Sequence, residues 1–331
     1  MRLSRRALTL TAAAGLLLPL ALTGCGSQAD DSGAGGTQKV RFGYLADFNG
    51  TSLLAIADKQ DLWKKAGLSP EIKVFTNGPV QIQALGAGDL DFGYIGPGAM
   101  WLPASGRAKI VSINTLGYAD RVIAQAGIDT MADLKGKKVG VPEGTSGEMI
   151  LDLALEDAGM SPKDVEKVPM DPSTVVSAFS SGQIDAAGIW YPLIDTIKQR
   201  KPDLVELATT RDMPENVFPT AFVSGTDTKS DLTKKVVKVL QEANDWRAAH
   251  PQEAVQVTAA MLKIDVAKVE ADASNVETLT TDELVARTED GSVKEWLTGL
   301  NEFFTKNGKL PKAPDPDTYY SGDLYTQVAA Q

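Results

Sequence analysis

A short segment of this chain recurs at a fixed distance, and it constrains the fold more than any other feature. Residues 84–91 read ALGAGDLD, and 94 positions later residues 178–185 read AFSSGQID. In both copies a helical pattern stops at a glycine, which ends a helix without a side-chain clash. A short apolar run follows and ends in a sharp turn: Gly96-Pro97-Gly98 or Trp190-Tyr191-Pro192. We expect two similar halves with these turns facing each other across a cleft.

Strand and helix patterns alternate around the first copy. Residues 39–45 and 71–75 have strand character, whereas residues 53–65 and 79–85 have helical spacing. This order predicts an α/β fold with a parallel sheet covered by helices. Ligands of such sheets lie in the crevice at the carboxyl ends of the strands, so we expect the functional residues there.

The first 25 residues have the pattern of an export signal. Arginines precede an apolar run over residues 7–22, which is shorter than the ~20 residues of a comfortable membrane span. The run ends in LTGC, which resembles the bacterial lipobox. We therefore predict a lipoprotein signal peptide over residues 1–25, with lipid attached at Cys25. A generic secretory peptide with an incidental cysteine is the alternative, and export by the Sec or the twin-arginine route stays open.

Residues 26–38 contain no apolar side chain larger than alanine and are rich in Gly, Ser and Asp. Such a composition is typical of a flexible tether. Together with the lipid, it predicts a folded body on the extracytoplasmic face of the cell membrane, attached only through Cys25.

Composition excludes several functions. The chain has 33 basic and 43 acidic residues, which argues against nucleic acid and against polybasic attachment to lipid. Cys25 is the only cysteine, so no intramolecular disulfide forms. His250 is the only histidine, next to a predicted helix end. The chain therefore lacks the histidines that histidine-based catalysis or a multi-histidine metal site would need. We expect no enzyme, no cofactor and no metal, although catalysis by carboxylates alone stays open in principle.

A glycine-rich loop lies between the two copies. Residues 133–148, DLKGKKVGVPEGTSGE, predict a basic turn, a buried strand, a loop and the start of a helix that ends near Gly159. Free amides at a helix start favour an anion, and Thr145 and Ser146 add hydroxyl donors. Alternatively, Thr145 and Glu148 form a capping box that only satisfies the amides of the helix. The sequence favours neither interpretation.

Three segments together resemble a known family. They are QALGAGDLDFGYIGP, DLKGKKVGVPEGTSGE and AFSSGQIDAAGIWYP. They resemble signature segments of the type II periplasmic binding proteins for sulfonates, taurine and nitrate, a group that also contains thiamine-precursor binding proteins. The resemblance runs from about Val40 to the C-terminus, and residues 275–309 are similar to the taurine-binding branch.

The resemblance implies a two-lobed fold with mixed sheets flanked by helices. It places one lobe at residues 39–122 and 220–331 and the other at residues 123–219. Two crossing strands, near residues 120–125 and 220–223, form a hinge, and the helical tail packs on the first lobe. The implied function is the solute-binding component of an ABC importer, a monomer that works with a permease and its ATPase.

The resemblance also implies that ligand contacts come from loops at strand ends. These map to Asn49, Gly96, Pro97, Tyr118, Thr145, Ser146 and Trp190. An ordinary Asn-Gly turn explains Asn49 equally well, and a structural role is the alternative for Tyr118. Trp190 is expected to cover an alkyl part of the ligand, with a core position as the alternative.

The solute is expected to be a small anion or zwitterion. Several neutral donors can satisfy a sulfonate without a buried cation. Arg121 is then more simply explained by a salt bridge at the hinge. The ammonium of taurine needs a carboxylate, for which Asp47 or Glu143 is available. Residues 218–222 lack the acidic residue expected in taurine proteins, so aliphatic sulfonates compete with taurine.

Several other functions stay open to different degrees. A binding protein for nitrate or for a pyrimidine thiamine precursor is the alternative within the same group. A ligand sensor that docks on a membrane receptor also fits the sequence. An enzyme of the thiamine-pyrimidine synthase type is disfavoured, because that chemistry depends on histidine and His250 lies outside every predicted cleft loop.

Overall fold

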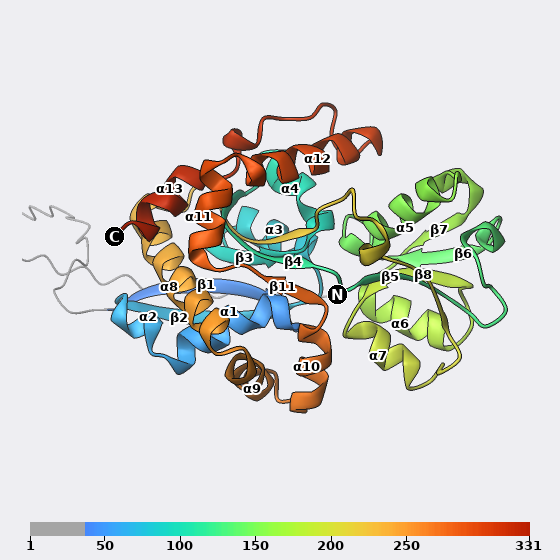
Figure 1. Cartoon of the computed structure of the whole chain (residues 1–331), viewed down its shortest axis with the longest axis horizontal. Coiled ribbons are helices and arrows are strands. Elements are labelled where there is room, and N and C mark those ends of the chain that lie inside the picture. Colours follow the sequence, from blue (N-terminus) through green and yellow to red (C-terminus); the bar gives the residue numbers. More distant parts are fainter. Residues whose placement is uncertain (1–36) are drawn as a thin grey trace, which may run out of the picture. The chain divides into compact units, whose positions relative to one another are not determined.

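A computed structural model describes residues 37–331 (Figure 1). The predicted signal peptide, Cys25 and the tether up to residue 36 lie outside the described residues. The first strand begins at Gln38, so the last position assigned to the tether already belongs to the sheet. In this part of the chain, no helix is both long and apolar enough to cross a membrane.

The first lobe is built on a six-stranded mixed sheet. Its order is β11-β4-β10-β3-β1-β2. Strand β1 is parallel to β2 and β3, whereas β10 is antiparallel to β3 and β4 and β11 is antiparallel to β4. The bounds are β1 (Gln38–Leu45), β2 (Leu68–Phe75), β3 (Phe92–Ile95), β4 (Lys109–Gly117), β10 (Pro219–Ser224) and β11 (Val276–Thr278).

The second lobe is built on a five-stranded mixed sheet of order β7-β6-β8-β5-β9, drawn in green to yellow in Figure 1. Strand β6 is parallel to β7 and β8, and β5 is antiparallel to β8 and β9. The bounds are β5 (Asp120–Ala124), β6 (Lys138–Val141), β7 (Glu166–Pro169), β8 (Ala186–Trp190) and β9 (Val205–Thr209). The predicted α/β class with two mixed sheets is thus confirmed.

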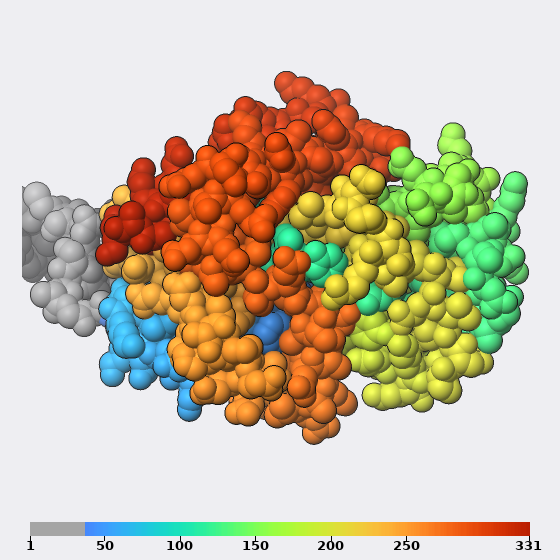
Figure 2. Space-filling model, in the orientation of Figure 1, coloured from blue at the N-terminus to red at the C-terminus, as the bar shows by residue number. Residues whose placement is uncertain are grey.

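Helices cover both sheets. They are α1 (Phe48–Lys59), α2 (Leu62–Lys65), α3 (Gly78–Gly86), α4 (Trp101–Ala104), α5 (Ser146–Asp157), α6 (Pro172–Ser180), α7 (Leu193–Lys198), α8 (Ser230–Ala249), α9 (Pro251–Leu262), α10 (Val266–Ala273), α11 (Thr281–Glu289), α12 (Ser292–Lys306) and α13 (Gly322–Ala329). The C-terminal helices belong to the first lobe, where α8 and α13 pack on β4 and α9 packs on α1. Figure 2 shows them in orange and red, next to the yellow segment that leads into β10.

The recurring segment forms the same unit in each lobe. In one copy α3 leads into β3, and in the other α6 leads into β8. The turns between helix and strand contain Gly88 at φ +75° and Gly182 at φ +74°, a conformation that side chains with a Cβ disfavour. The two glycines therefore end both helices in the same way.

The chain crosses between the sheets twice within one compact unit. Tyr118 and Ala119 connect β4 to β5, and residues 210–218 connect β9 to β10. The expected crossings at residues 120–125 and 220–223 therefore fall in the strands just after each crossing. In consequence, β5 begins directly at the hinge, with Asp120 as its first residue.

Aromatic packing fixes the centre of the first sheet. The Phe42 ring lies 5.6 Å from that of Phe92 on the neighbouring strand and 5.7 Å from that of Phe222. All three side chains are fully buried. Such packing of large apolar side chains makes the sheet a rigid base for the loops at its carboxyl edge.

Candidate functional site

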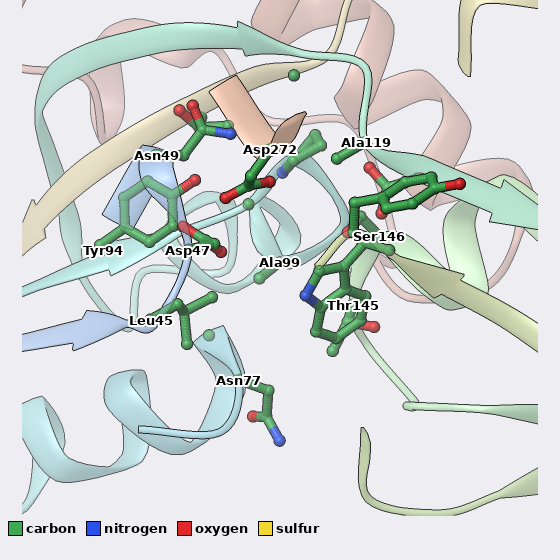
Figure 3. A pocket seen from close by; sticks show the side chains of 18 residues that line it. Leu45, Asp47, Asn49, Asn77, Tyr94, Ala99, Ala119, Thr145, Ser146 and Asp272 are labelled. Atoms are coloured by element: carbon green, nitrogen blue, oxygen red, sulfur yellow. The ribbon is translucent and has the colours of Figure 1, made fainter. Parts of the chain in front are cut away.

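A pocket lies where strand ends and loops of the two lobes meet (Figure 3). The first lobe supplies the loops after β1 and β3, and the second lobe supplies the end of β8 and the start of α5. The lining residues are Leu45, Asp47, Asn49, Asn77, Gly78, Tyr94, Gly96, Pro97, Ala99, Gly117, Ala119, Asp120, Thr145, Ser146, Trp190, Tyr191, Thr220 and Asp272. This is the crevice expected at the carboxyl ends of strands.

Two buried carboxylates cap the start of α1. The Gly50 amide donates a hydrogen bond to Asp47 Oδ1 over 2.6 Å, and the Phe48 amide donates to Asp272 Oδ2, also over 2.6 Å. Burial raises the pKa of Asp47 to about 6. Burial and the nearby Asp47 charge raise the pKa of Asp272 well above its ordinary value. Figure 3 shows both carboxylates beside Tyr94.

Asn49 follows this cap, and hydrogen bonds from strand β4 hold it in place. Thr115 Oγ1 donates to Asn49 Oδ1 over 2.7 Å and lies 2.8 Å from Thr220 Oγ1. The Asn114 amide group donates to the Asn49 carbonyl over 2.8 Å. Because Oδ1 is engaged, Nδ2 is the atom of this side chain that is left to donate to a solute. Asn49 lies inside α1, so the Asn-Gly turn interpretation does not apply.

Asp120 enters the pocket from the hinge. The residue is 4% exposed, and its Oδ1 is buried without a hydrogen-bond partner in the described part of the chain. Burial raises its pKa to about 6, although the nearby Ser146 hydroxyl and Arg121 charge oppose the shift. The Arg121 guanidinium itself binds elsewhere, with Nε 3.0 Å from Glu206 Oε2. Arg121 thus forms the salt bridge expected at the hinge.

The loop before α5 provides donors from the second lobe. Thr145 Oγ1 donates to the Pro142 carbonyl over 2.6 Å and accepts from the Gly147 amide over 3.2 Å. The capping interpretation therefore describes Thr145 well. Glu148, however, accepts from the Gly144 amide at 2.8 Å, so a strict Thr145–Glu148 capping box does not form. Ser146 lines the pocket as the first residue of α5.

The two lobes touch beside this loop. A Cβ placed on Gly98 in the first lobe would lie 2.2 Å from the Ser146 amide nitrogen in the second. Trp101 Nε1 in the first lobe donates a hydrogen bond to the Gly144 carbonyl in the second over 3.3 Å. Only glycine at position 98 permits this approach, so the described conformation is one in which the lobes are closed on each other.

Aromatic rings complete the pocket. Trp190 is the last residue of β8, is partly exposed and lines the pocket together with Tyr191. The Tyr191 hydroxyl donates to Glu206 Oε1 over 2.6 Å, which holds its ring in place. A fully buried core position for Trp190 does not describe this arrangement.

Two of the residues predicted for the site lie outside this pocket. The Tyr118 hydroxyl donates to Glu277 Oε2 over 3.1 Å, and the Tyr118 ring faces the Arg211 guanidinium at 4.6 Å. Glu143 is exposed and lies 3.4 Å from the ammonium of Lys309. The pocket does bring together Asp47, Asn49, Gly96, Pro97, Thr145, Ser146 and Trp190.

Two of the three carboxylates in the pocket are not among the site residues that the sequence predicts. Asp120 stands directly after the crossing, and its place at a strand start was an available signal. Asp272 belongs to α10 in the C-terminal tail, and no local pattern connects it with Asp47. These two carboxylates line the pocket, whereas residues 218–222 contain no acidic residue.

Within the described residues, the ionisable carboxylates in the pocket lining have no basic side chain beside them in the lining. Three aspartates line the pocket, whereas no lysine, arginine or histidine does so within residues 37–331. No cluster in this range has the composition of a metal site. The arrangement offers carboxylate oxygens from the first lobe and hinge, and hydroxyl and amide donors at the start of α5. Such a pocket suits a compact solute with a positive or amine end and an anionic end.

Comparisons with known proteins agree with this architecture. Residues 50–254 match the family described as NMT1/THI5 like. A putative binding protein of Brucella abortus is 56% identical over 291 residues, which covers 87% of this chain and 91% of the relative. A putative aliphatic sulfonates-binding protein of Bacillus subtilis is 27% identical, covering 78% of this chain and 80% of the relative.

Solved structures show the same fold at low sequence identity. The alkanesulfonate-binding protein of Xanthomonas axonopodis superposes with a TM-score of 0.65 at 20% identity, covering 87% of this chain and 99% of that chain. The family match spans more than half of the chain, and the Brucella relative is covered almost completely. The chain therefore belongs to the NMT1/THI5 like family and has the fold of its periplasmic binding proteins.

Proposed function

We propose that the chain is the extracytoplasmic solute-binding component of an ABC importer and that its solute is a small zwitterion, with taurine as the first candidate. The observation that carries this proposal is the pocket lining, in which three carboxylates face no basic side chain within residues 37–331. A positive group on the solute would relieve the repulsion between these carboxylates.

The two ends of a zwitterion match different parts of the pocket. Its ammonium would lie near Asp47, Asp120 and Asp272. Its sulfonate would accept hydrogen bonds from Ser146 and from Asn49 Nδ2, without a buried cation. Both lobes would then contact one molecule, which favours the closed conformation.

Simple anions fit this lining less well. An aliphatic sulfonate or nitrate places a negative charge beside three carboxylates and has no positive group to balance them. We therefore place taurine ahead of aliphatic sulfonates, although the named Bacillus relative is a putative binder of the latter.

A pyrimidine thiamine precursor is the second candidate. The observation in its favour is that Trp190 and Tyr191 line the same pocket as the carboxylates. An aminopyrimidine has a flat ring for aromatic contacts and amine hydrogens for carboxylate acceptors.

Isothermal titration calorimetry at pH 7.5 tests the proposal with four probes. They are taurine, isethionate, nitrate and an aminopyrimidine thiamine precursor. Isethionate is the matched control, because a hydroxyl replaces the ammonium of taurine at the same chain length. Binding of taurine at least tenfold tighter than isethionate is the expected result. Equal affinity for nitrate, isethionate and taurine would contradict the zwitterion proposal.

We infer a transport role with attachment through Cys25, rather than catalysis or sensing. Folds of this kind host different activities, so the pocket and the N-terminal sequence, rather than the fold, support a transport role. Mass spectrometry of the membrane fraction is expected to find lipid on Cys25 and none in a Cys25→Ser variant. Uptake of labelled solute that stops when the gene is deleted would separate transport from sensing.

A further inference from the structure

The three carboxylates of the pocket are not equivalent. Asp47 and Asp272 each use an oxygen to cap α1, at 2.6 Å from a backbone amide. Their presence is explained, at least in part, by the helix start. Asp120 caps nothing, and its Oδ1 is buried without a partner in the described part of the chain. A buried acceptor without a partner costs free energy, so this carboxylate calls for another explanation.

The surroundings of Asp120 compensate its charge only in part, through the nearby Ser146 hydroxyl and Arg121 charge, and leave Oδ1 without a partner in the described part of the chain. The adjacent Arg121 is held by Glu206, by the Tyr118 carbonyl at 2.6 Å and by Asn275 Oδ1 at 3.0 Å. These three partners lie outside the pocket lining. The guanidinium also donates to the Asp120 backbone carbonyl over 2.8 Å, but it makes no hydrogen bond to the Asp120 carboxylate. An opposite charge from a solute would supply the missing partner.

The position of Asp120 brings three parts of the fold together. It follows the crossing at residues 118–119, pairs with Trp190 across the ladder of β5 and β8, and lies near Ser146 at the start of α5. A group bound by Asp120 therefore contacts the hinge and the second lobe at once.

We infer that Asp120 is the specificity-determining residue that selects solutes with a positively charged or amine group. This inference rests on the proposed function and deepens it, because it assigns the discrimination to one side chain. Asp47 and Asp272 each have an oxygen engaged at the start of α1, whereas Asp120 forms the direct contact through its free Oδ1.

The test compares Asp120→Asn with the wild-type protein, using taurine and isethionate as probes. Asparagine keeps the shape of the side chain and removes its charge. The wild-type protein is expected to prefer taurine at least tenfold, and Asp120→Asn is expected to lose most of that preference. Its affinity for isethionate should stay the same or increase, because one negative charge has been removed from the pocket.

Two further variants control the experiment. Asp203→Asn removes a carboxylate from an exposed position of the same lobe and should keep the preference for taurine. Asp120→Ala removes both oxygens and should give the same loss of preference as Asp120→Asn. Circular dichroism confirms that each variant is folded before titration.

The outcomes separate the inference from the proposed function. If wild type prefers taurine and Asp120→Asn keeps that preference, the assignment to Asp120 is wrong and the proposed function stands. If the wild-type protein binds isethionate as tightly as taurine, the zwitterion proposal fails. Should only the aminopyrimidine bind, taurine is excluded and the same two variants are titrated with that probe, where an unchanged affinity overturns the inference. Binding of none of the probes overturns both.

Discussion

Lys309 and Glu148 join the two lobes, with Lys309 Nζ 2.9 Å from Glu148 Oε2. Lys309 follows α12 in the first lobe, and Glu148 lies in the first turn of α5 in the second. The Glu148 side chain is only 10% exposed and also binds Lys167 at 3.0 Å. Its Oε2 accepts from the Gly144 amide as well, so the ion pair bears directly on the loop that carries Thr145 and Ser146.

This pair predicts that Lys309→Met weakens binding of every solute by a similar factor of about 3–10. The reason is that the variant removes a contact of the closed conformation and touches no solute, and a partly screened ion pair contributes about 1 kcal/mol. Calorimetry with each bound probe measures the factor. Lys306→Met is the matched control, since its pair with Glu156 is more exposed, with side chains 63% and 53% accessible. A loss confined to one solute would instead place Lys309 in contact with it.

Gly98→Ala is predicted to reduce affinity at least tenfold for all solutes. The added Cβ would lie 2.2 Å from the Ser146 nitrogen, so the lobes can no longer approach as described. The free energy of unfolding of the ligand-free protein should change far less if the lobes open without solute. The control is Gly299→Ala in α12, where a Cβ meets nothing within 4 Å. That change should add about 0.5–1 kcal/mol of stability and leave binding unchanged. Wild-type affinity in Gly98→Ala would contradict the described contact.

Asp120→Asn is predicted to stabilise the ligand-free protein at pH 7.5 by about 1–3 kcal/mol. The pKa of Asp120 is about 6 in the folded state, against an ordinary value of 3.8, so the folded state binds the proton more tightly. Its stabilising contribution is complete below pH 3.8 and is lost as the pH rises through 6. The advantage of the variant should therefore shrink towards pH 4.

Urea unfolding at several pH values between 4 and 7.5 measures this difference. Asp47 and Asp272 also have raised pKa values and titrate in both proteins. Because the Asp47 charge contributes to the raised pKa of Asp120, the difference reports Asp120 together with its interaction with Asp47. If Asp120→Asn is less stable than the wild-type protein by the same amount at every pH, the Asp120 carboxylate has a structural role.

Alanine substitutions of Thr145 and Ser146 are predicted to have different effects on stability and binding, although both residues line the pocket. Thr145→Ala should lower the free energy of unfolding by about 1 kcal/mol, because its hydroxyl caps α5. Ser146→Ala should leave stability nearly unchanged and weaken binding of a sulfonate-bearing solute several-fold. Thermal unfolding and calorimetry on both variants measure the two effects. The reverse pattern would assign the anion contact to Thr145.

The main features of the fold could be predicted because they depend on local patterns. Helices that stop at a glycine, followed by short apolar runs, are visible in residues 84–95 and 178–189. These patterns place strand ends, and strand ends place Gly96 and Trp190 in the pocket. The helical tail on the first lobe came from the family resemblance rather than from any pattern.

The direction of individual side chains could not be predicted in the same way. Tyr118 and Glu143 both stand near strand ends, yet the first binds Glu277 and the second lies against Lys309 outside the pocket. Asp272 reaches the Phe48 amide across 224 positions of sequence. Contacts over such a distance are set by how α10 packs on the first lobe, which a local pattern does not encode.

The first crossing between the sheets has a consequence for how recognition and motion are related. The turning point at residues 118–119 and the carboxylate of Asp120 belong to the same few residues of backbone. If Asp120 selects the solute as proposed, selectivity and the connection between the two sheets share one piece of chain. Substitutions that change the backbone or the side-chain size at this point are therefore expected to affect both properties together, whereas Asp120→Asn changes the charge alone.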